Sequence, residues 1–401
     1  MVDFRPFRGV LPRLSTDEDI SDRISPPYDI ISEEEQARLQ SKPYNITRIT
    51  LGAKDGKYDE AARTLDSWLA TGKLFQDDVE CYYLYRQSFQ DKGGMLTRNG
   101  IIGVLRSEGY EAGNIIPHEE TFPKVKEDRL NLLRSTETHC ESIFGLYDRS
   151  DLDMGSIARN ATKLNECKDP SGTVHELFRI SDRSTVDNIR KIMKDKKILI
   201  ADGHHRYETS YKYSQENPQE EKKSYVLCTM VSSQDTGMFV RPTHRLIKNL
   251  KFQEEKLLEA MGKHFSLRQV KDQAAAEAAL EVATVPTFGL LFPSGKVVVA
   301  EFVAPRGDIL WTIDTYVCQE VILKDILYQL PKGNELVIEY DHDLASVAKK
   351  VKAGGTDLTI LVRAPPLDEV WSVAQAGRKM PKKTTYFWPK VWSGFVLYRM
   401  K

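Results

Sequence analysis

The residues with the greatest capacity for chemistry stand in one run, Asp202-Gly203-His204-His205-Arg206. An apolar stretch, 198–201, precedes this run and polar, helix-forming sequence follows it, so the pattern predicts a strand, a tight turn and a helix. Gly203 allows a sharp bend and close approach of a ligand. Cationic side chains at a helix start oppose the helix dipole unless an anion lies between them. We therefore expect a phosphate-binding turn, with Gly203 and Arg206 as phosphate contacts. The alternative is structural: the histidines bind neighbouring carbonyl groups, and Arg206 pairs with Glu208 or with a distant carboxylate.

Two other segments present acidic side chains. In Pro26-Pro27-Tyr28-Asp29 the residues before proline are driven out of the helical region, which suits either a rigid ligand loop or an ordinary helix entry. In His118-Glu119-Glu120 a histidine lies beside two carboxylates, a composition that fits a general base with an orienting partner and equally fits a surface. No second histidine has the helical spacing of a zinc protease.

A basic segment lies near the C-terminal end, between Gly377 and Lys390. It contains the candidate anion contacts Arg378, Lys382, Lys383, Thr384 and Thr385, interleaved with aromatic residues. These groups could neutralise a small phosphorylated ligand, bind single-stranded RNA, or form a solvated loop. We favour the small ligand, because one segment provides few phosphate contacts for a nucleic acid. We also expect this segment to share one ligand site with Asp202 to Arg206.

Composition limits the class of protein. Lys and Arg number 57 against 58 Asp and Glu, a net charge of -1, so no global field favours nucleic acid or a membrane surface. The five cysteines are scattered, which indicates a reducing compartment, and no window approaches a signal peptide or a membrane span. We expect a cytoplasmic protein, with no prediction of its oligomeric state.

The 401 residues suit two or three domains. Parallel strands separated by helices are expected up to about residue 240, which favours an α/β or α+β fold with a mixed sheet. We place the domains at 1–240 and 241–401, the second an α+β domain that contributes the basic segment to the site. Ile46 to Leu51 alternates like a strand, and 59–70 and 272–282 predict helices. No P-loop or Rossmann glycine pattern is present.

Six motifs together resemble the domain-of-unknown-function family 1015, from near residue 4 to near residue 398. They are Arg5-Pro6-Phe7-Arg8-Gly9, Pro26-Pro27-Tyr28-Asp29, Pro117-His118-Glu119 with Thr121, Asp128-Arg129, Ala201 to Tyr207, and Met380 to Phe387 with Pro389-Lys390 and Ser393-Gly394. The family name itself implies no reaction.

A more distant resemblance does imply one. Asp202-Gly203-His204-His205-Arg206 is similar to the phosphate-binding signature of the ParB/sulfiredoxin superfamily, and in particular of its free-serine kinases. Histidine stands where sulfiredoxin has its reactive cysteine, which argues against reductase chemistry. The resemblance implies a ParB/sulfiredoxin-like core and a phosphotransferase that acts on free L-serine or O-phosphoserine, with ATP or ADP as co-substrate.

Residue roles follow from this reading. Asp202 or Glu119 would accept the proton of the serine hydroxyl, while Gly203, His204, His205, Arg206 and His118 would surround the phosphate. A divalent metal, Mg²⁺, would bridge the nucleotide phosphates and be held by Asp29, Asp202 or Glu119. One rival is a phosphoserine phosphatase, in which His204 or His205 acts as nucleophile or acid. Others are a non-catalytic nucleotide-binding regulator and an RNA-binding module.

Overall fold

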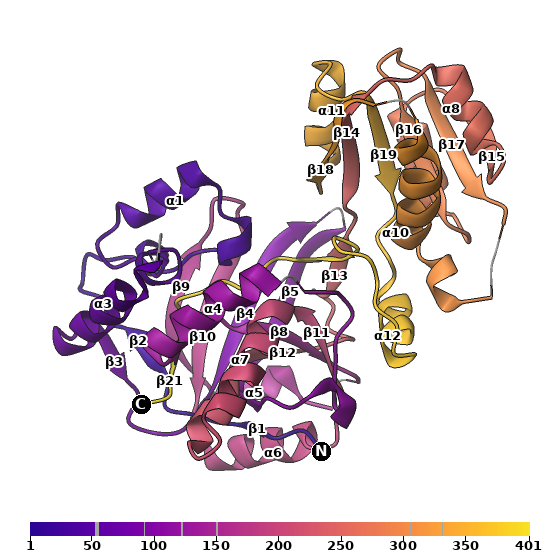
Figure 1. Cartoon of the computed structure of the whole chain (residues 1–401). Helices are drawn as coiled ribbons and strands as arrows, with labels where there is room; N and C mark the ends of the chain where they lie inside the picture. Colours follow the sequence, from indigo (N-terminus) through magenta and orange to yellow (C-terminus); the bar gives the residue numbers. More distant parts are fainter. Residues whose placement is uncertain (53–55, 92, 122, 150, 305–306, 331) are drawn as a thin grey trace. The chain divides into compact units, whose positions relative to one another are not determined.

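A computed structural model describes residues 1–52, 56–91, 93–121, 123–149, 151–304, 307–330 and 332–401 (Figure 1). The chain forms two compact units. Unit 1 comprises Met1–Pro117, Thr121–Met238 and Pro389–Lys401, and unit 2 comprises His118–Glu120 and Phe239–Trp388. Residues 389–401, which we expected in the second domain, therefore pack with the first, and 118–120 pack with the second.

Unit 1 is built on a mixed sheet. Along the sheet the strand order is β6-β11-β8-β12-β5-β4-β10-β9, and β1 also pairs with β5. The strands are β1 Phe4–Arg5, β4 Tyr82–Asp91, β5 Gly94–Arg106, β6 Ile115–Ile116, β8 Ile143–Tyr147, β9 Thr162–Lys168, β10 Val174–Ile180, β11 Ile198–Asp202 and β12 Tyr225–Ser232. Only β6 with β11 and β8 with β12 pair in parallel within the described residues. The mixed α/β class is confirmed, whereas the expected predominance of parallel strands is wrong.

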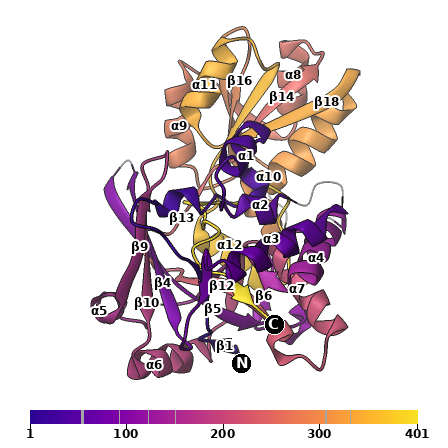
Figure 2. The ribbon, with the colours of Figure 1, turned by 90° about the vertical axis from the view of Figure 1, so that its left-hand side faces the viewer.

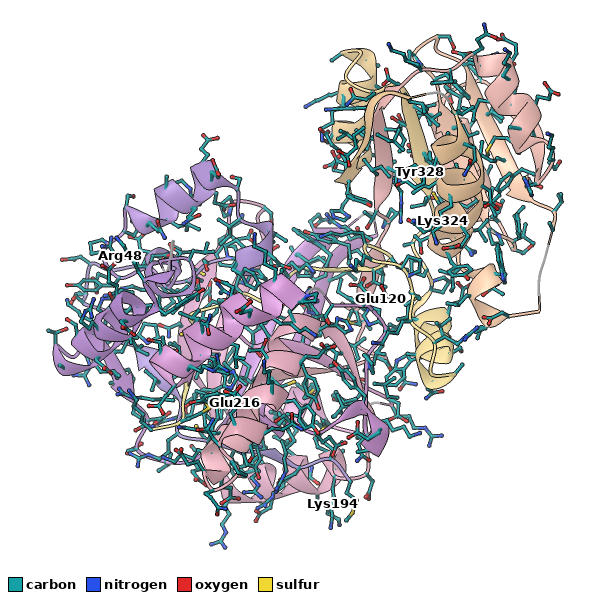
Figure 3. All side chains as sticks on the ribbon, viewed as in Figure 1. Arg48, Glu120, Lys194, Glu216, Lys324 and Tyr328 are labelled. Carbon is teal, nitrogen blue, oxygen red and sulfur yellow. The ribbon has the colours of Figure 1, made fainter. Side chains whose placement is uncertain are left out.

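Helices cover this sheet and a neighbouring layer. They are α1 Glu33–Gln40, α2 Thr47–Thr50, α3 Tyr58–Ala70, α4 Pro123–Thr136, α5 Met154–Asn160, α6 Arg183–Met193 and α7 His204–Glu216, with 3₁₀ turns η1 Ile20–Asp22, η2 Tyr28–Ile30, η4 Tyr110–Ala112 and η5 Glu221–Ser224. Helices α4 and α7 lie side by side (Figure 1). Glu216, at the end of α7, accepts two hydrogen bonds from Arg134 of α4, at 2.6 and 2.9 Å (Figure 3).

The cores of unit 1 follow from the apolar periodicity of these elements. Helix α3 buries Ala61, Leu65 and Trp68, which lie on one helical face, against Val10 and Leu397 of the chain ends. Short strand pairs complete this layer: β2 Val10–Pro12 with β3 Leu74–Gln76, and β7 Thr138–His139 with β21 Tyr398–Arg399. Both ends of the described chain are thus built into unit 1.

Residues 46–51, expected as a strand, contain the helix α2. The buried side chain of Asn45 accepts hydrogen bonds from the Thr47 N–H at 3.0 Å and the Thr47 hydroxyl at 2.7 Å. Its amide group donates to the carbonyls of Asp22 and Ile24. This local cap and its tertiary anchors outweigh the alternating pattern.

Unit 2 has a sheet of order β15-β17-β16-β19-β14-β18, fully antiparallel in its described pairs. The strands are β14 His244–Leu250, β15 Phe265–Val270, β16 Thr287–Leu291, β17 Val297–Phe302, β18 Lys332–Asp341 and β19 Leu358–Val362; β13 Phe239–Arg241 pairs separately with β20 Tyr386–Trp388. The helices are α8 Glu254–Met261, α9 Gln273–Glu281, α10 Asp314–Val317, the π-helix η7 Cys318–Ile326, α11 Leu344–Lys352 and α12 Leu367–Gln375, with turns η6 Ile309–Thr312 and η8 Leu327–Gln329.

The two faces of the second sheet carry separate apolar clusters. One joins α8 and η7 to the sheet, and the other joins α9 and α11 to it (Figure 2). The helices expected over 59–70 and 272–282 are confirmed as α3 and α9. None of the described helices combines the length and apolar composition needed to cross a membrane.

Candidate active site

The Asp202 turn has the predicted strand, turn and helix. The buried strand β11 ends at Asp202, and α7 begins at His204. Gly203, between them, has φ +91° and ψ 30°, a left-handed conformation that L side chains rarely adopt. Because the N-cap residue Gly203 has no side chain, α7 begins without the serine, threonine or aspartate cap that usually binds the first N–H groups of a helix.

The Asp202 carboxylate binds two cations. Its Oδ1 lies 2.6 Å from Lys390 Nζ, and its Oδ2 lies 2.8 Å from an Arg206 nitrogen. All three side chains are largely buried. Burial alone would raise the pKa of Asp202, but the charges of Lys390 and Arg206 outweigh burial and hold this pKa well below its usual range. Asp202 is therefore a poor proton acceptor.

The buried Arg206 side chain holds the turn through two contacts. Besides its bond to Asp202, it donates to the Ser142 carbonyl at 2.6 Å, and only 9% of the residue is exposed. A Cβ atom at Gly203 would lie 3.0–3.1 Å from the Arg206 guanidinium, which leaves little room for any side chain there. Arg206 is thus ion-paired with Asp202, four residues before it, a partner that the structural alternative did not name, and its role as a phosphate contact stays a prediction.

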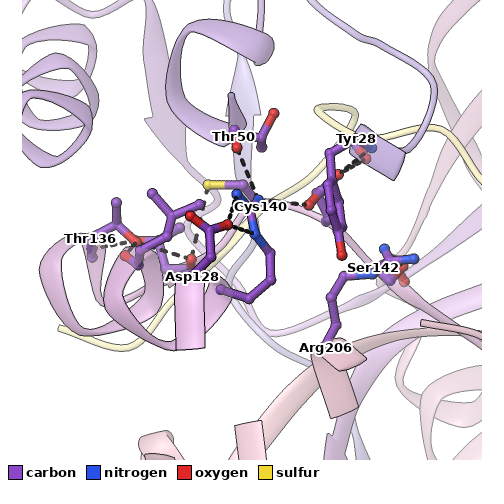
Figure 4. A network of polar contacts seen from close by, with 12 residues as sticks. Tyr28, Thr50, Asp128, Thr136, Cys140, Ser142 and Arg206 are labelled. Carbon is purple, nitrogen blue, oxygen red and sulfur yellow. Dashed lines mark hydrogen bonds and ion pairs between the residues drawn. The ribbon is translucent and has the colours of Figure 1, made fainter. Parts of the chain in front are cut away.

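Tyr28, in the Pro26-Pro27-Tyr28-Asp29 segment, lies near Arg206 (Figure 4), and the charge of Asp29 also acts on Arg206. The Tyr28 N–H donates to Glu141 Oε1 at 3.1 Å, and the Arg129 guanidinium carbon lies 4.4 Å from the centre of the Tyr28 ring. Asp29 is exposed, and its charge contributes to the raised pKa of Arg206 and opposes the lowering of the His205 pKa by burial. Asp29 makes no hydrogen bond or ion pair within the described residues.

The Glu141 carboxylate links the proline loop, Pro26 to Asp29, to Ser393 and Arg129. Its carboxylate accepts hydrogen bonds from the Tyr28 N–H and the Ser393 hydroxyl, and lies 3.8 Å from Arg129. Burial raises the pKa of Glu141, although the charges of Arg206 and Arg129 oppose this change. Arg129 also binds the Asp128 carboxylate at 2.5 Å.

A cavity of about 40 Å³ lies against this network, large enough for a few water molecules. Its lining includes Thr50, Arg129, Glu141, Arg206 and Thr209.

The C-terminal strap, Pro389–Ser393, brings Lys390 to the turn. The Lys390 carbonyl accepts from the Gln87 amide at 2.8 Å, and the Pro389 carbonyl accepts from the buried Arg98. The backbone of Ser393 exchanges two hydrogen bonds with that of Ser25, just before the proline loop. These contacts fix the lysine ammonium on Asp202.

The two histidines of the turn differ in exposure. His204 is buried, and its charge contributes to the lowered pKa of Asp202. His205 is half-buried, and burial lowers its pKa below 6.5 despite the nearby charges of Glu208 and Asp29. His205 is therefore mainly neutral at pH 7.

The other predicted residues form the Thr385 cluster in unit 2. His118 Nε2 lies 2.8 Å from Thr385 Oγ1, which also donates to Glu119 at 3.4 Å. The Met380 N–H donates to the His118 carbonyl at 2.9 Å. The hydroxyl of buried Thr384 donates to the Pro381 carbonyl at 2.5 Å and lies 2.8 Å from that of Thr315.

The cations of the basic segment have different environments. Arg378 forms an ion pair with Asp308. Lys382 is half-buried, whereas Lys383 is exposed and has a positive φ of 60°. The expected sharing of one site by this segment and the Asp202 turn stays a prediction.

The metal prediction can be compared with the donor groups. Within the described residues, no group of three or more histidine, cysteine, aspartate or glutamate side chains is arranged to hold a metal ion. Asp202 fits poorly, because both of its oxygens are ion-paired. Asp29 fits better, since Mg²⁺ often takes one protein carboxylate together with substrate phosphates and water.

The sequence does not predict roles for Lys390, Glu141 and Ser142 in this site, although Lys390 is the last residue of the basic segment. The sequence signal for Lys390 is the Pro389-Lys390 motif, whereas no local pattern indicates that Glu141 binds the proline loop.

Comparisons with known proteins give a family and three distant folds. Residues 4–316 match the family described as "Protein of unknown function (DUF1015)". No curated protein matches the chain. Three similar solved structures are a conserved hypothetical protein from Pyrococcus furiosus (15% identity, 73% of this chain, 92% of that chain, TM-score 0.38), a free serine kinase in complex with AMP (14%, 72%, 86%, 0.39) and SbnI with C-terminal truncation from Staphylococcus aureus (10%, 73%, 85%, 0.38). The family match ends before the basic segment, and TM-scores this low carry no argument about activity.

Proposed function

Since the chain belongs to the DUF1015 family, whose name states no reaction, we propose from the site itself that it is a phosphotransferase. Its reaction would move a phosphoryl group between a nucleotide, ATP or ADP, and the hydroxyl group of a small acceptor. The acceptor would be free L-serine, with O-phosphoserine as its phosphorylated form. The serine and nucleotide assignments rest on the resemblance of the Asp202 to Arg206 motif to that of free-serine kinases.

One observation carries the proposal: α7 starts at a left-handed glycine, which has no capping side chain of its own, beside two buried cations that share one carboxylate. A phosphate at Gly203 would add the negative charge that a helix N-terminus favours. Lys390 and Arg206 hold Asp202 in place and leave positive charge at the turn. Phosphoryl transfer depends mainly on positioning and on neutralising phosphate charge, which such a site supplies.

Asp29 is the carboxylate best placed to act on the acceptor. It is exposed beside Arg206 and His205, and it has no hydrogen-bonded partner within the described residues. Asp202 has a lowered pKa and two ion pairs, so we assign proton acceptance to Asp29 and not to Asp202. Magnesium, when bound, would shield the nucleotide phosphates, with Asp29 as its one protein carboxylate at the turn if it serves as a ligand.

These two roles of Asp29 can be separated by Asp29→Asn. Loss of the proton acceptor should lower kcat, with little change in the Mg²⁺ concentration that gives half-maximal rate. Loss of a metal ligand should instead raise that concentration. Glu33→Gln, an exposed neighbour at the start of α1, is the matched control and should change neither quantity.

The direct test follows phosphorus by NMR. The protein is incubated with Mg²⁺ and either ATP plus serine or ADP plus phosphoserine. Phosphoserine formed from ATP, or ATP formed from ADP and phosphoserine, supports the proposal. Nucleotide-independent release of inorganic phosphate from phosphoserine would identify a phosphatase, with the neutral His205 as a candidate nucleophile. Binding of nucleotide without any turnover would identify a regulator.

A further inference from the structure

A second cavity in unit 1 has no part in the site above. Its volume is about 390 Å³, within the range of small-molecule sites. The N-terminal motif Arg5-Pro6-Phe7-Arg8 forms one wall, and none of the lining residues belongs to the Asp202 turn, the proline loop or the C-terminal strap. We call it the Arg190 pocket.

Positive charge dominates this pocket. Its cationic lining residues are Arg5, Arg8, Arg190, Lys222 and Arg399, and its acidic ones are Glu80 and Glu221. They come from separate parts of the chain, including α6, η5 and β21. Folding has therefore gathered five cations and two carboxylates around one cavity in a chain whose net charge is only -1.

Some of these cations already have partners. Arg5 binds Asp3 and Glu221, each at 2.8 Å, and Arg399 binds Asp66 at 2.9 Å. The Lys222 ammonium donates to the Lys401 carbonyl at 3.0 Å. These pairs hold the walls in place, but Asp3 and Asp66 are outside the lining.

Other donors in the pocket remain available. Arg8 uses its Nε to donate to the Asp77 carbonyl at 2.8 Å, which leaves the two terminal nitrogens of its guanidinium group. The exposed side chain of Arg190 makes no hydrogen bond or ion pair within the described residues, although its charge acts on the Asp3 carboxylate. A guanidinium group presents parallel N–H donors that match two oxygens of a phosphate or carboxylate.

The floor beneath these donors is rigid. Phe7 and Tyr398 are buried and meet edge to face with ring centres 5.6 Å apart. The Tyr398 hydroxyl donates to the Lys222 carbonyl at 2.8 Å, which ties η5 to this floor. The Arg5 guanidinium group lies over the Tyr225 ring, with its carbon 4.8 Å from the ring centre. The Arg5 guanidinium group, held in this way, would lose little freedom when it binds an anion.

We propose that the Arg190 pocket binds a small metabolite with two or more phosphate or carboxylate groups. The class follows from the excess of cations, the arginine donors without partners and the volume. Arg190 and Arg8 would provide the principal contacts. This site is separate from the proposed phosphotransferase site and does not depend on its activity.

Calorimetric titration with pyrophosphate tests the proposal, because this probe carries two phosphate groups and no other recognition element. The titration uses the full chain carrying Gly203→Val, so that binding at the Asp202 turn is removed. We expect saturable binding that Arg190→Glu weakens by about tenfold or more, since it removes a bidentate contact and adds a repulsive charge. Arg183→Glu makes the same charge change on the same helix, at a side chain that is 96% exposed and outside the pocket, and should leave the affinity within about twofold.

Three outcomes would overturn the pocket: no saturable binding to the Gly203→Val chain, equal weakening by Arg190→Glu and Arg183→Glu, or no effect of either. Circular dichroism checks that all variants stay folded. If Gly203→Val fails to fold, the same titration is done on the otherwise unchanged protein, and only the component removed by Arg190→Glu counts as the pocket. Phosphoryl transfer by the unchanged protein is measured in a separate assay. Each of the two proposals can therefore fail without affecting the test of the other.

Discussion

At the Asp202 turn, one buried carboxylate contacts two cations at 2.6 and 2.8 Å, whereas the Thr385 cluster is held mainly by hydroxyl, imidazole and backbone groups. Charged partners inside a protein are costly to separate, because a buried charge left alone loses its solvation. Hydrogen bonds between neutral groups cost far less to remove. We therefore expect changes at the turn to alter both the free energy of unfolding and the binding of a charged ligand. Changes in the Thr385 cluster should alter only the local structure of that segment.

Removing the charge of Lys390 should have the largest effect. Lys390→Met keeps the apolar stem but leaves Asp202 with Arg206 alone, and breaking such a buried pair costs about 3–5 kcal/mol. The measurement is the free energy of opening of the β11 amides by hydrogen exchange. Lys42→Met is the control, because its ion pair with Asp22 is about half exposed on both sides and should contribute about 0–1 kcal/mol. If the two changes cost the same free energy, the buried ion pair of the turn would be no more stabilising than the half-exposed pair of Lys42 and Asp22.

Gly203→Val should act next most strongly, on ligand binding. The substitution strains a left-handed backbone and moves the Arg206 guanidinium, and we expect nucleotide affinity to fall by about 100-fold, the scale of losing a donor aimed at phosphate charge. Gly72→Val has the same backbone strain, with φ +69°, but open space around its Cβ. It should reduce stability without changing affinity. A Gly203→Val chain that melts lower yet binds nucleotide normally would exclude the turn as the phosphate site.

The pH dependence of anion binding tests the role of His205. Burial lowers its pKa below 6.5, so the ring becomes charged only as the pH falls through that lowered value. Charging adds attraction for an anion, and affinity should therefore rise as pH falls, by a few-fold or about 1 kcal/mol. Sulfate is the probe, because its charge is constant over this range. The pH-dependent part should vanish in His205→Gln; if it persists unchanged, another group senses the pH.

The sequence was sufficient to predict the turn but not its partners. An apolar run that stops at Asp202-Gly203 marks a strand end and a helix start, and the structure has both at these residues. The link between Asp202 and Lys390 joins residues 188 positions apart, and only the packing of the strap against Gln87 and Arg98 creates it. The sequence also does not predict the parallel or antiparallel direction of the strands. An apolar run indicates that a strand is buried, but it does not indicate which strand lies beside it.

The smallest expected effect is that of Thr385→Val in unit 2. Valine keeps the shape of threonine and removes the hydroxyl that bonds His118 at 2.8 Å, at a cost of about 0.5–1.5 kcal/mol. Hydrogen exchange of the amides of residues 380–388 measures this local loss. Thr312→Val, at an exposed hydroxyl that donates to the Ile309 carbonyl, is the control and should change the exchange around it by less. If Thr385→Val cost as much as Lys390→Met, neutral contacts in the cluster would equal the ion pairs of the turn, and the distinction between the two regions would fail. A cost of about 1 kcal/mol, confined to this segment, would support it, because the change removes the hydrogen bonds of the Thr385 hydroxyl to His118 and Glu119 but does not itself remove a charged group.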